Sequence, residues 1–139
     1  MQVGLEPVLG VRLGGMSYQL TIEERPAYVY AKATGERTPA NALRFLEEAY
    51  AACVKSGRAA LLLDMQFTGP NLNTTSVYQV ISQRVPDGRN LRRIAYVDSS
   101  TGDSDIPYFA ETVAVNRGVN VRLFPSLAAA ETWLASEGD

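Results

Sequence analysis

One stretch of the sequence, LLLDMQFTGPNLNTTS (residues 61–76), carries residue types that phosphate chemistry uses. A run of leucines ends on Asp64, and a loop of amides and glycine leads to the hydroxyls of Thr74, Thr75 and Ser76. These hydroxyls are candidate phosphoacceptors, because free N–H groups and the helix dipole at a helix start stabilise a phosphate. The simpler alternative is a strand followed by a helix that Thr74 or Thr75 caps.

One position in this stretch argues against a phosphotransfer enzyme. In haloacid-dehalogenase phosphatases the strand ends in Asp-x-Asp-x-Thr, and Gln66 stands where the second aspartate, the general acid, belongs. A two-component receiver domain also needs an acidic pair where this chain has Thr34 and Gly35. Without histidine, an enzyme built on Asp64, Asp98 or a tyrosine needs a strongly shifted pKa. We therefore expect no catalytic residues and no enzymatic activity.

A second polar stretch, DSSTGDSD (residues 98–105), offers carboxylate and hydroxyl oxygens that Mg²⁺ or Ca²⁺ could use, beginning with Asp98 and Ser99. Its spacing does not fit an EF-hand, which needs alternating acids and a glutamate at the twelfth position. A loop that ends with Ser104 or Asp105 as a helix cap explains the same residues. We expect no metal site and no cofactor.

Aromatic residues give a third candidate site. Phe67, Tyr78, Tyr96 and Tyr108 follow the predicted parallel strands, whose carboxyl ends border the usual ligand crevice of an open α/β sheet. Core packing is the alternative, although a tyrosine hydroxyl favours a pocket rim. The candidate ligand or partner surface comprises Asp64, Phe67, Tyr78, Tyr96, Asp98, Ser99 and Tyr108.

Four arginines, Arg84, Arg89, Arg92 and Arg93, surround a predicted turn. We expect a solvated loop there, with a phosphate-binding patch as the alternative. A net charge of −2 gives the whole chain no long-range attraction to nucleic acid, so no nucleic-acid partner is expected.

Composition narrows the class of protein further. The chain has 139 residues, 46% of them hydrophobic and 20% charged, as in one globular domain. It contains no histidine and one cysteine, Cys53, which excludes zinc sites of His and Cys and Ser/His/Asp triads. Cys53 is predicted to be a buried hydrophobe. A lone cysteine suits a reducing cytoplasm, and no apolar run approaches the roughly 18 residues of a membrane span.

The elements that must position these residues follow from periodicity. Residues 1–16 are predicted to be a leader or an extra edge strand, and residues 17–139 form the domain. Alternation predicts a hairpin over residues 17–34, and a Thr38 cap with Gly57 beyond it predicts a long helix. Three βα units follow, with strands at 59–65, 92–98 and 119–124 and helices at about 76–84, 105–117 and from 126. The prediction is an α/β fold, with a mixed, mostly parallel sheet and about four helices.

This pattern resembles the SpoIIAA-like family of the STAS and Sec14-like group over residues 17–136. The resemblance rests on the hairpin, the long helix, LLLDMQFTG, RRIAYV (residues 92–97) and VRLFPSLAAAETWL (residues 121–134). It implies a regulatory or binding role without catalysis. The anti-sigma-factor antagonists of this group carry a phosphorylated serine at the start of the helix after this strand. Here Asn73-Thr74-Thr75-Ser76 replaces their Asp-Ser-Ser-Gly-like motif.

Two modes of action follow from the resemblance. In the first, the carboxyl end of the sheet docks a protein partner and phosphorylation of Thr74, Thr75 or Ser76 gates the docking. In the second, an apolar cleft holds a small hydrophobic or lipid-like ligand, as the Sec14-like relationship suggests. We also expect a cytoplasmic protein that could form a homodimer through an open sheet edge.

Overall fold

A computed structural model describes residues 18–98 and 104–136 of the chain. Residues 1–16, predicted to be a leader or an extra edge strand, lie outside this part. In the described part, strands and helices follow the order β1 (Tyr18–Glu24), β2 (Val29–Glu36), α1 (Pro39–Ser56), β3 (Ala60–Thr68), α2 (Thr74–Gly88), β4 (Arg93–Asp98), α3 (Ile106–Val115), β5 (Val121–Leu123) and α4 (Leu127–Ala135).

The five strands form one sheet in the order β1-β2-β3-β4-β5. β1 and β2 pair antiparallel as a hairpin, and every later neighbour pairs parallel. The parallel pairs follow because each crossover helix returns the chain in the same direction. The predicted fold class, a hairpin followed by three βα units in a mixed, mostly parallel sheet, is confirmed.

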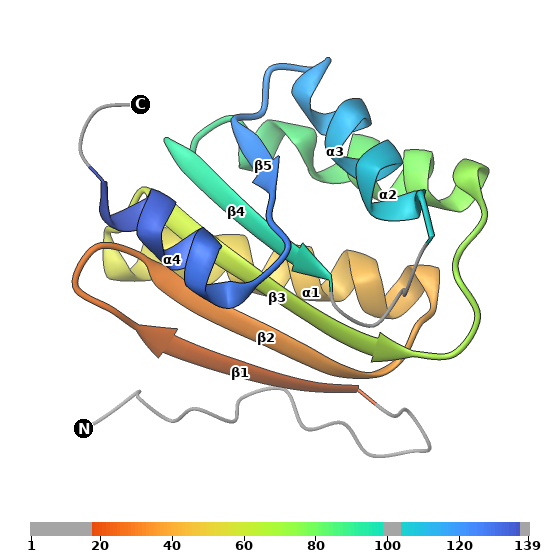
Figure 1. The fold of residues 1–139 in the computed structure, drawn as a ribbon, viewed down its shortest axis with the longest axis horizontal. Helices are drawn as coiled ribbons and strands as arrows, with labels where there is room; N and C mark the ends of the chain where they lie inside the picture. Colours follow the sequence, from red (N-terminus) through yellow and green to blue (C-terminus); the bar gives the residue numbers. More distant parts are fainter. Residues whose placement is uncertain (1–17, 99–103, 137–139) are drawn as a thin grey trace.

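Helices cover both faces of the sheet (Figure 1). α1, α2 and α3 lie on one face, and α4 lies alone on the other. Strand alternation sorts the side chains between these layers: Val29 and Ala31 pack toward α1–α3, whereas Tyr28 and Tyr30 pack with α4 and its Trp133. β3 is apolar along most of its length because both of its faces are covered.

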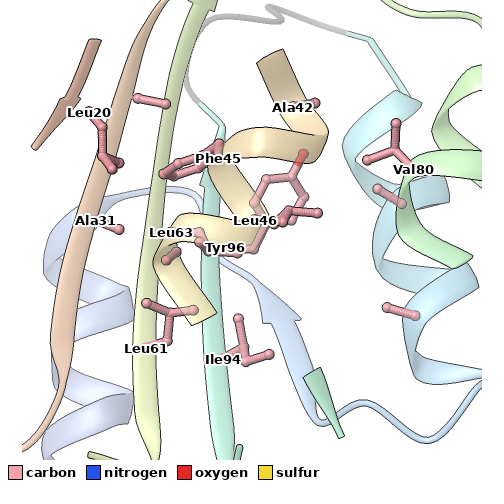
Figure 2. Close-up of a cluster of buried hydrophobic side chains, with 14 of the residues drawn as sticks. Leu20, Ala31, Ala42, Phe45, Leu46, Leu61, Leu63, Val80, Ile94 and Tyr96 are labelled. Atoms are coloured by element: carbon pink, nitrogen blue, oxygen red, sulfur yellow. The ribbon is translucent and has the colours of Figure 1, made fainter. Parts of the chain in front are cut away.

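α1 has the ends that its sequence predicts. The backbone N–H of Asn41 donates to Thr38 Oγ1 at 3.0 Å, Pro39 occupies the first turn, and Gly57 closes the helix with a φ of 73°. Its apolar face packs on the sheet, with Phe45 fully buried (Figure 2). Cys53 is buried in the same face, and burial raises the pKa of its thiol to about 12. The predicted packing role of Cys53 is confirmed.

α2 differs from the prediction at both ends. Its cap is Asn73, whose side-chain oxygen accepts the Ser76 N–H at 2.8 Å, so the predicted cap at Thr74 or Thr75 is wrong. Asparagine is as good an N-cap as threonine, and it stands one position earlier. The helix also continues past Arg84 to Gly88, with Pro86 inside its last turn. Because proline has no N–H, the i→i−4 hydrogen bond at this position is missing from the last turn.

Arg93 is buried, contrary to the solvated loop predicted for the arginines. Strand alternation points its side chain to the α4 face, where it donates to the Trp133 carbonyl and to Ser136 O at 3.1 Å. Its guanidinium carbon lies 5.2 Å from the Trp133 ring centroid. The last carbonyls of a helix lack partners within the helix, and Arg93 supplies hydrogen-bond donors to them at the carboxyl end of α4.

Candidate functional site

A cavity of about 90 Å³ lies between the sheet and the layer formed by α1, α2 and α3. Strands β3 and β4 line it with Leu63, Phe67, Ile94 and Tyr96. The helices line it mainly with alanine, valine and leucine, namely Ala42, Leu46, Val77, Val80, Ala110 and Ala114. Figure 2 shows Tyr96 and Leu46 on one side of this space and Val80 on the other. Small side chains on the helices leave the space between the layers unfilled.

The carboxyl end of the sheet gives the cavity a polar rim. Tyr96 Oη donates to Asp98 Oδ2 at 3.0 Å, and Arg37 Nη2 donates to the Phe67 carbonyl at 2.8 Å. Burial first, and then the charge of Asp98, raises the pKa of Tyr96, so its hydroxyl keeps its proton. Glu111 on α3 accepts the Leu123 N–H at 2.8 Å. These polar groups hold the strand ends and the helices in place around the rim.

Of the predicted aromatic set, Phe67 and Tyr96 line the cavity, and Tyr78 and Tyr108 do not. Tyr78 is 45% exposed, accepts a hydrogen bond from Arg117 Nη2 at 2.7 Å and stacks under that guanidinium. Tyr108 is 63% exposed on the outer side of α3. The prediction of one cleft ringed by all four aromatics is therefore wrong, because helical periodicity turns two of them outward.

Asp64 lies on the opposite face of the sheet from the cavity. The strand alternates, so Leu63 and Phe67 face α1–α3 while Asp64 faces the α4 side. Asp64 is 1% exposed and accepts the Tyr30 hydroxyl at 2.5 Å and Gln66 Nε2 at 3.1 Å. The predicted grouping of Asp64 with Phe67 and Asp98 at one surface is corrected: Asp64 is a buried acceptor in a separate network.

The candidate phosphoacceptors stand at the start of α2. Thr74 and Thr75 are exposed and Ser76 is half-buried, with its N–H bonded to the Asn73 cap. The preceding Leu72 lines the cavity, so this helix start adjoins the cavity's carboxyl end. Ser99, the remaining predicted surface residue, lies outside the described residues. Asp98 lines the cavity as part of the rim.

The predicted site omitted several cavity residues that carry polar groups. Arg37 follows directly after β2. A charged residue at the carboxyl end of a parallel strand is a candidate site residue, so this position could have been predicted from the sequence. Arg84 continues the spacing of Val77, Val80 and Ile81 along α2, which places it on the cavity-facing side. Tyr50 occupies the corresponding side of α1. Helical periodicity could therefore have predicted that Arg84 and Tyr50 face the cavity.

Two negative observations apply to residues 18–98 and 104–136. In this part, no three His, Cys, Asp or Glu side chains are grouped to hold a metal ion. No helix here is long and apolar enough to cross a membrane.

The sequence matches no family model and no curated protein. It is similar in structure to an uncharacterized protein of the DUF3478 family with a SpoIIAA-like fold from Shewanella loihica PV-4. The chain has a SpoIIAA-like fold. The match covers 91% of this chain and 100% of the other, with 17% sequence identity and a TM-score of 0.52. The SpoIIAA-like fold expected from the hairpin, the long helix and the βα units is confirmed, and at this identity the likeness concerns the fold alone.

The Tyr30–Asp64 contact predicts a measurable loss of stability at alkaline pH. Burial first, and then the hydrogen bond to Asp64, raises the pKa of Tyr30 above its ordinary value of 10.0. Below pH 10 the phenol is protonated in both states. Above it the unfolded chain releases a proton that the folded chain keeps, so stability falls. Between about pH 9 and pH 11, the free energy of unfolding should therefore fall by about 1 kcal/mol less in Tyr30→Phe than in the wild type.

Urea unfolding at both pH values measures this difference. Tyr108→Phe, which removes an exposed hydroxyl, is the matched control and should follow the wild type. Parallel curves for Tyr30→Phe and the wild type would contradict the assignment. At neutral pH, Tyr30→Phe should itself be about 1–3 kcal/mol less stable, because Asp64 loses a buried donor.

Proposed function

We propose that the protein is a binding domain without catalytic activity that holds a small apolar molecule between the sheet and α1–α3. The observation that supports this is the apolar cavity beneath those helices. Protein interiors are packed with few voids larger than a water molecule, so an apolar space of this size in a domain core is unusual. Ligand pockets are typically apolar concavities with a few polar groups that fix orientation, as this one is.

The cavity's volume limits what it accepts without rearrangement. A dry apolar cavity of about 150 Å³ binds benzene. By that comparison, the cavity of about 90 Å³ takes roughly four carbon atoms. The ligand would therefore be a small molecule or the end of a chain whose remainder lies outside. A larger lipid would require α2 and α3 to move away from the sheet.

Filling the cavity should abolish binding without unfolding the protein. Ala110 on α3 is 7% exposed and lines the cavity, so Ala110→Leu places three more carbon atoms in that space. Stability should stay within about 1 kcal/mol of the wild type or rise, as for other cavity-filling changes. Hexan-1-ol should shift the NMR methyl signals of Leu63, Val80 and Ile94 in the wild type and not in Ala110→Leu.

The matched control is Ala128→Leu, which makes the same change at an exposed position of α4. It should bind hexan-1-ol like the wild type. Unchanged binding by Ala110→Leu would place the ligand elsewhere, and a wild type that binds no hexan-1-ol would contradict the proposed function. Native mass spectrometry of protein from its source cells would identify a retained natural ligand.

A second candidate function is docking of a protein partner, gated by phosphorylation at the start of α2. It is supported by the exposed Thr74 and Thr75 in the first turn, where a phosphate interacts favourably with the helix dipole. Because Leu72 borders the cavity, the two functions would share one end of the domain. A phosphate there would add about two negative charges to any interface.

Intact-mass and peptide analysis of protein from source cells tests this gating. We expect phosphate on Thr74, Thr75 or Ser76, and none on Thr132, an exposed threonine of α4 that serves as an internal control. Partner binding should then change in the Thr74→Ala, Thr75→Ala and Ser76→Ala variants. Partner binding that these three substitutions leave unchanged would rule the gating out.

A further inference from the structure

Tyr50 and Arg84 form a wall between the apolar cavity and the protein surface. Tyr50 comes from α1 and Arg84 from α2, and both line the cavity. Both also line a surface hollow of about 450 Å³ near the last turns of these helices. A molecule that reached from the hollow into the cavity would pass these two side chains.

The polar atoms of this wall are incompletely satisfied. Arg84 uses Nη1 for an ion pair with Asp87 at 3.1 Å, and its Nε–H is buried without a hydrogen-bond partner among the described residues. The Tyr50 hydroxyl also makes no hydrogen bond to the part of the chain that the structure describes. A buried donor without an acceptor costs about 1–3 kcal/mol, so this end of the cavity is suited to a ligand that brings an acceptor.

The surroundings keep both groups as donors. Burial first, and then the charge of Asp87, raises the pKa of Tyr50, so its hydroxyl stays protonated. Gly88 on α2 packs beside this hydroxyl, since a Cβ there would lie at ordinary contact distance, 3.4 Å, from Tyr50 Oη and 3.3 Å from Val119. The guanidinium has five N–H donors in a fixed plane, so its contact with Asp87 leaves Nε–H for another acceptor.

We propose that the ligand is a small unbranched carboxylic acid, with its alkyl chain in the cavity and its carboxylate between Tyr50 Oη and Arg84 Nε. This inference rests on the proposed function and adds the chemistry of the head group. Two separate donors match the two oxygens of a carboxylate. Glu47 and Asp87 also line the hollow, against Arg58 and Arg84, and this balance disfavours a doubly charged phosphate.

The test compares ligands that differ only in their head group. Isothermal titration of the purified full chain with hexanoate, hexan-1-ol and hexylamine at neutral pH measures the preference. Hexanoate should bind roughly tenfold or more tightly than hexan-1-ol, because hydrogen bonds to a charged group are the stronger ones. Hexylamine should bind most weakly, since it places a cation beside Arg84.

Two variants test whether Tyr50 and Arg84 cause the preference for hexanoate over hexan-1-ol. Arg84→Gln should remove the preference, so that the variant binds hexanoate and hexan-1-ol with about equal affinity. Tyr50→Phe removes a single hydroxyl and should weaken hexanoate binding several-fold. The matched control is Arg89→Gln, which changes an exposed arginine whose Nε is bonded to the Arg117 carbonyl. It should behave like the wild type.

The outcomes separate this inference from the proposed function. Equal affinity of the wild type for hexanoate and hexan-1-ol overturns the carboxylate assignment and leaves apolar binding intact. A preference for hexanoate that survives in both Arg84→Gln and Tyr50→Phe also overturns it, because the head group is then held elsewhere. If neither ligand binds, both proposals fail. The comparison within the wild type decides the head group even if Arg84→Gln does not fold.

Discussion

The coverage of β3 and β4 on both faces is the constraint on which the rest of the structure depends. Their side chains alternate between two enclosed layers, so each position is committed either to α1–α3 or to α4. Ile94 and Tyr96 therefore build the cavity wall, while Arg93 closes the end of α4. A shift of register by one residue would exchange these roles and bury the arginine in the apolar layer.

The cavity follows from a difference in side-chain size between the two layers. The strands present large side chains such as Phe67 and Tyr96 beside leucines, whereas α3 faces them with Ala110 and Ala114. The opposite layer shows no such difference, because Trp133 on α4 packs directly on the sheet with Phe124 5.3 Å from its ring. The same sheet thus has one filled face and one face with space for a ligand.

Much of this architecture was predictable from the sequence, because it depends on local signals. The caps of α1, the hairpin alternation and the largely apolar run predicted as a strand at residues 59–65 each have a local physical cause. The candidate site was less predictable. Asp64 and Phe67 are close in sequence, yet the strand sends them to opposite faces, and Tyr78 and Tyr108 depend on how α2 and α3 are rotated. Arg84 and Tyr50 become neighbours only through the packing of two helices.

The proposed function connects these features. We propose that the apolar interior, its polar rim at the carboxyl end and the donors at the opposite wall serve binding rather than catalysis. In this chain the proposed site lies on the sheet face that three helices cover. The exposed threonines at the start of α2 follow Leu72, which lines the same cavity, so ligand and partner binding would be coupled through one helix.

The central claim is that the space beneath α1–α3 is a genuine dry apolar cavity. Diffraction from crystals held under xenon tests it most directly, because xenon binds in dry apolar cavities. A bound xenon atom gives a strong peak in the electron density. We predict a xenon atom between Leu63, Tyr96 and Val80. Ordered waters in that space, or side chains that fill it completely, would contradict the account.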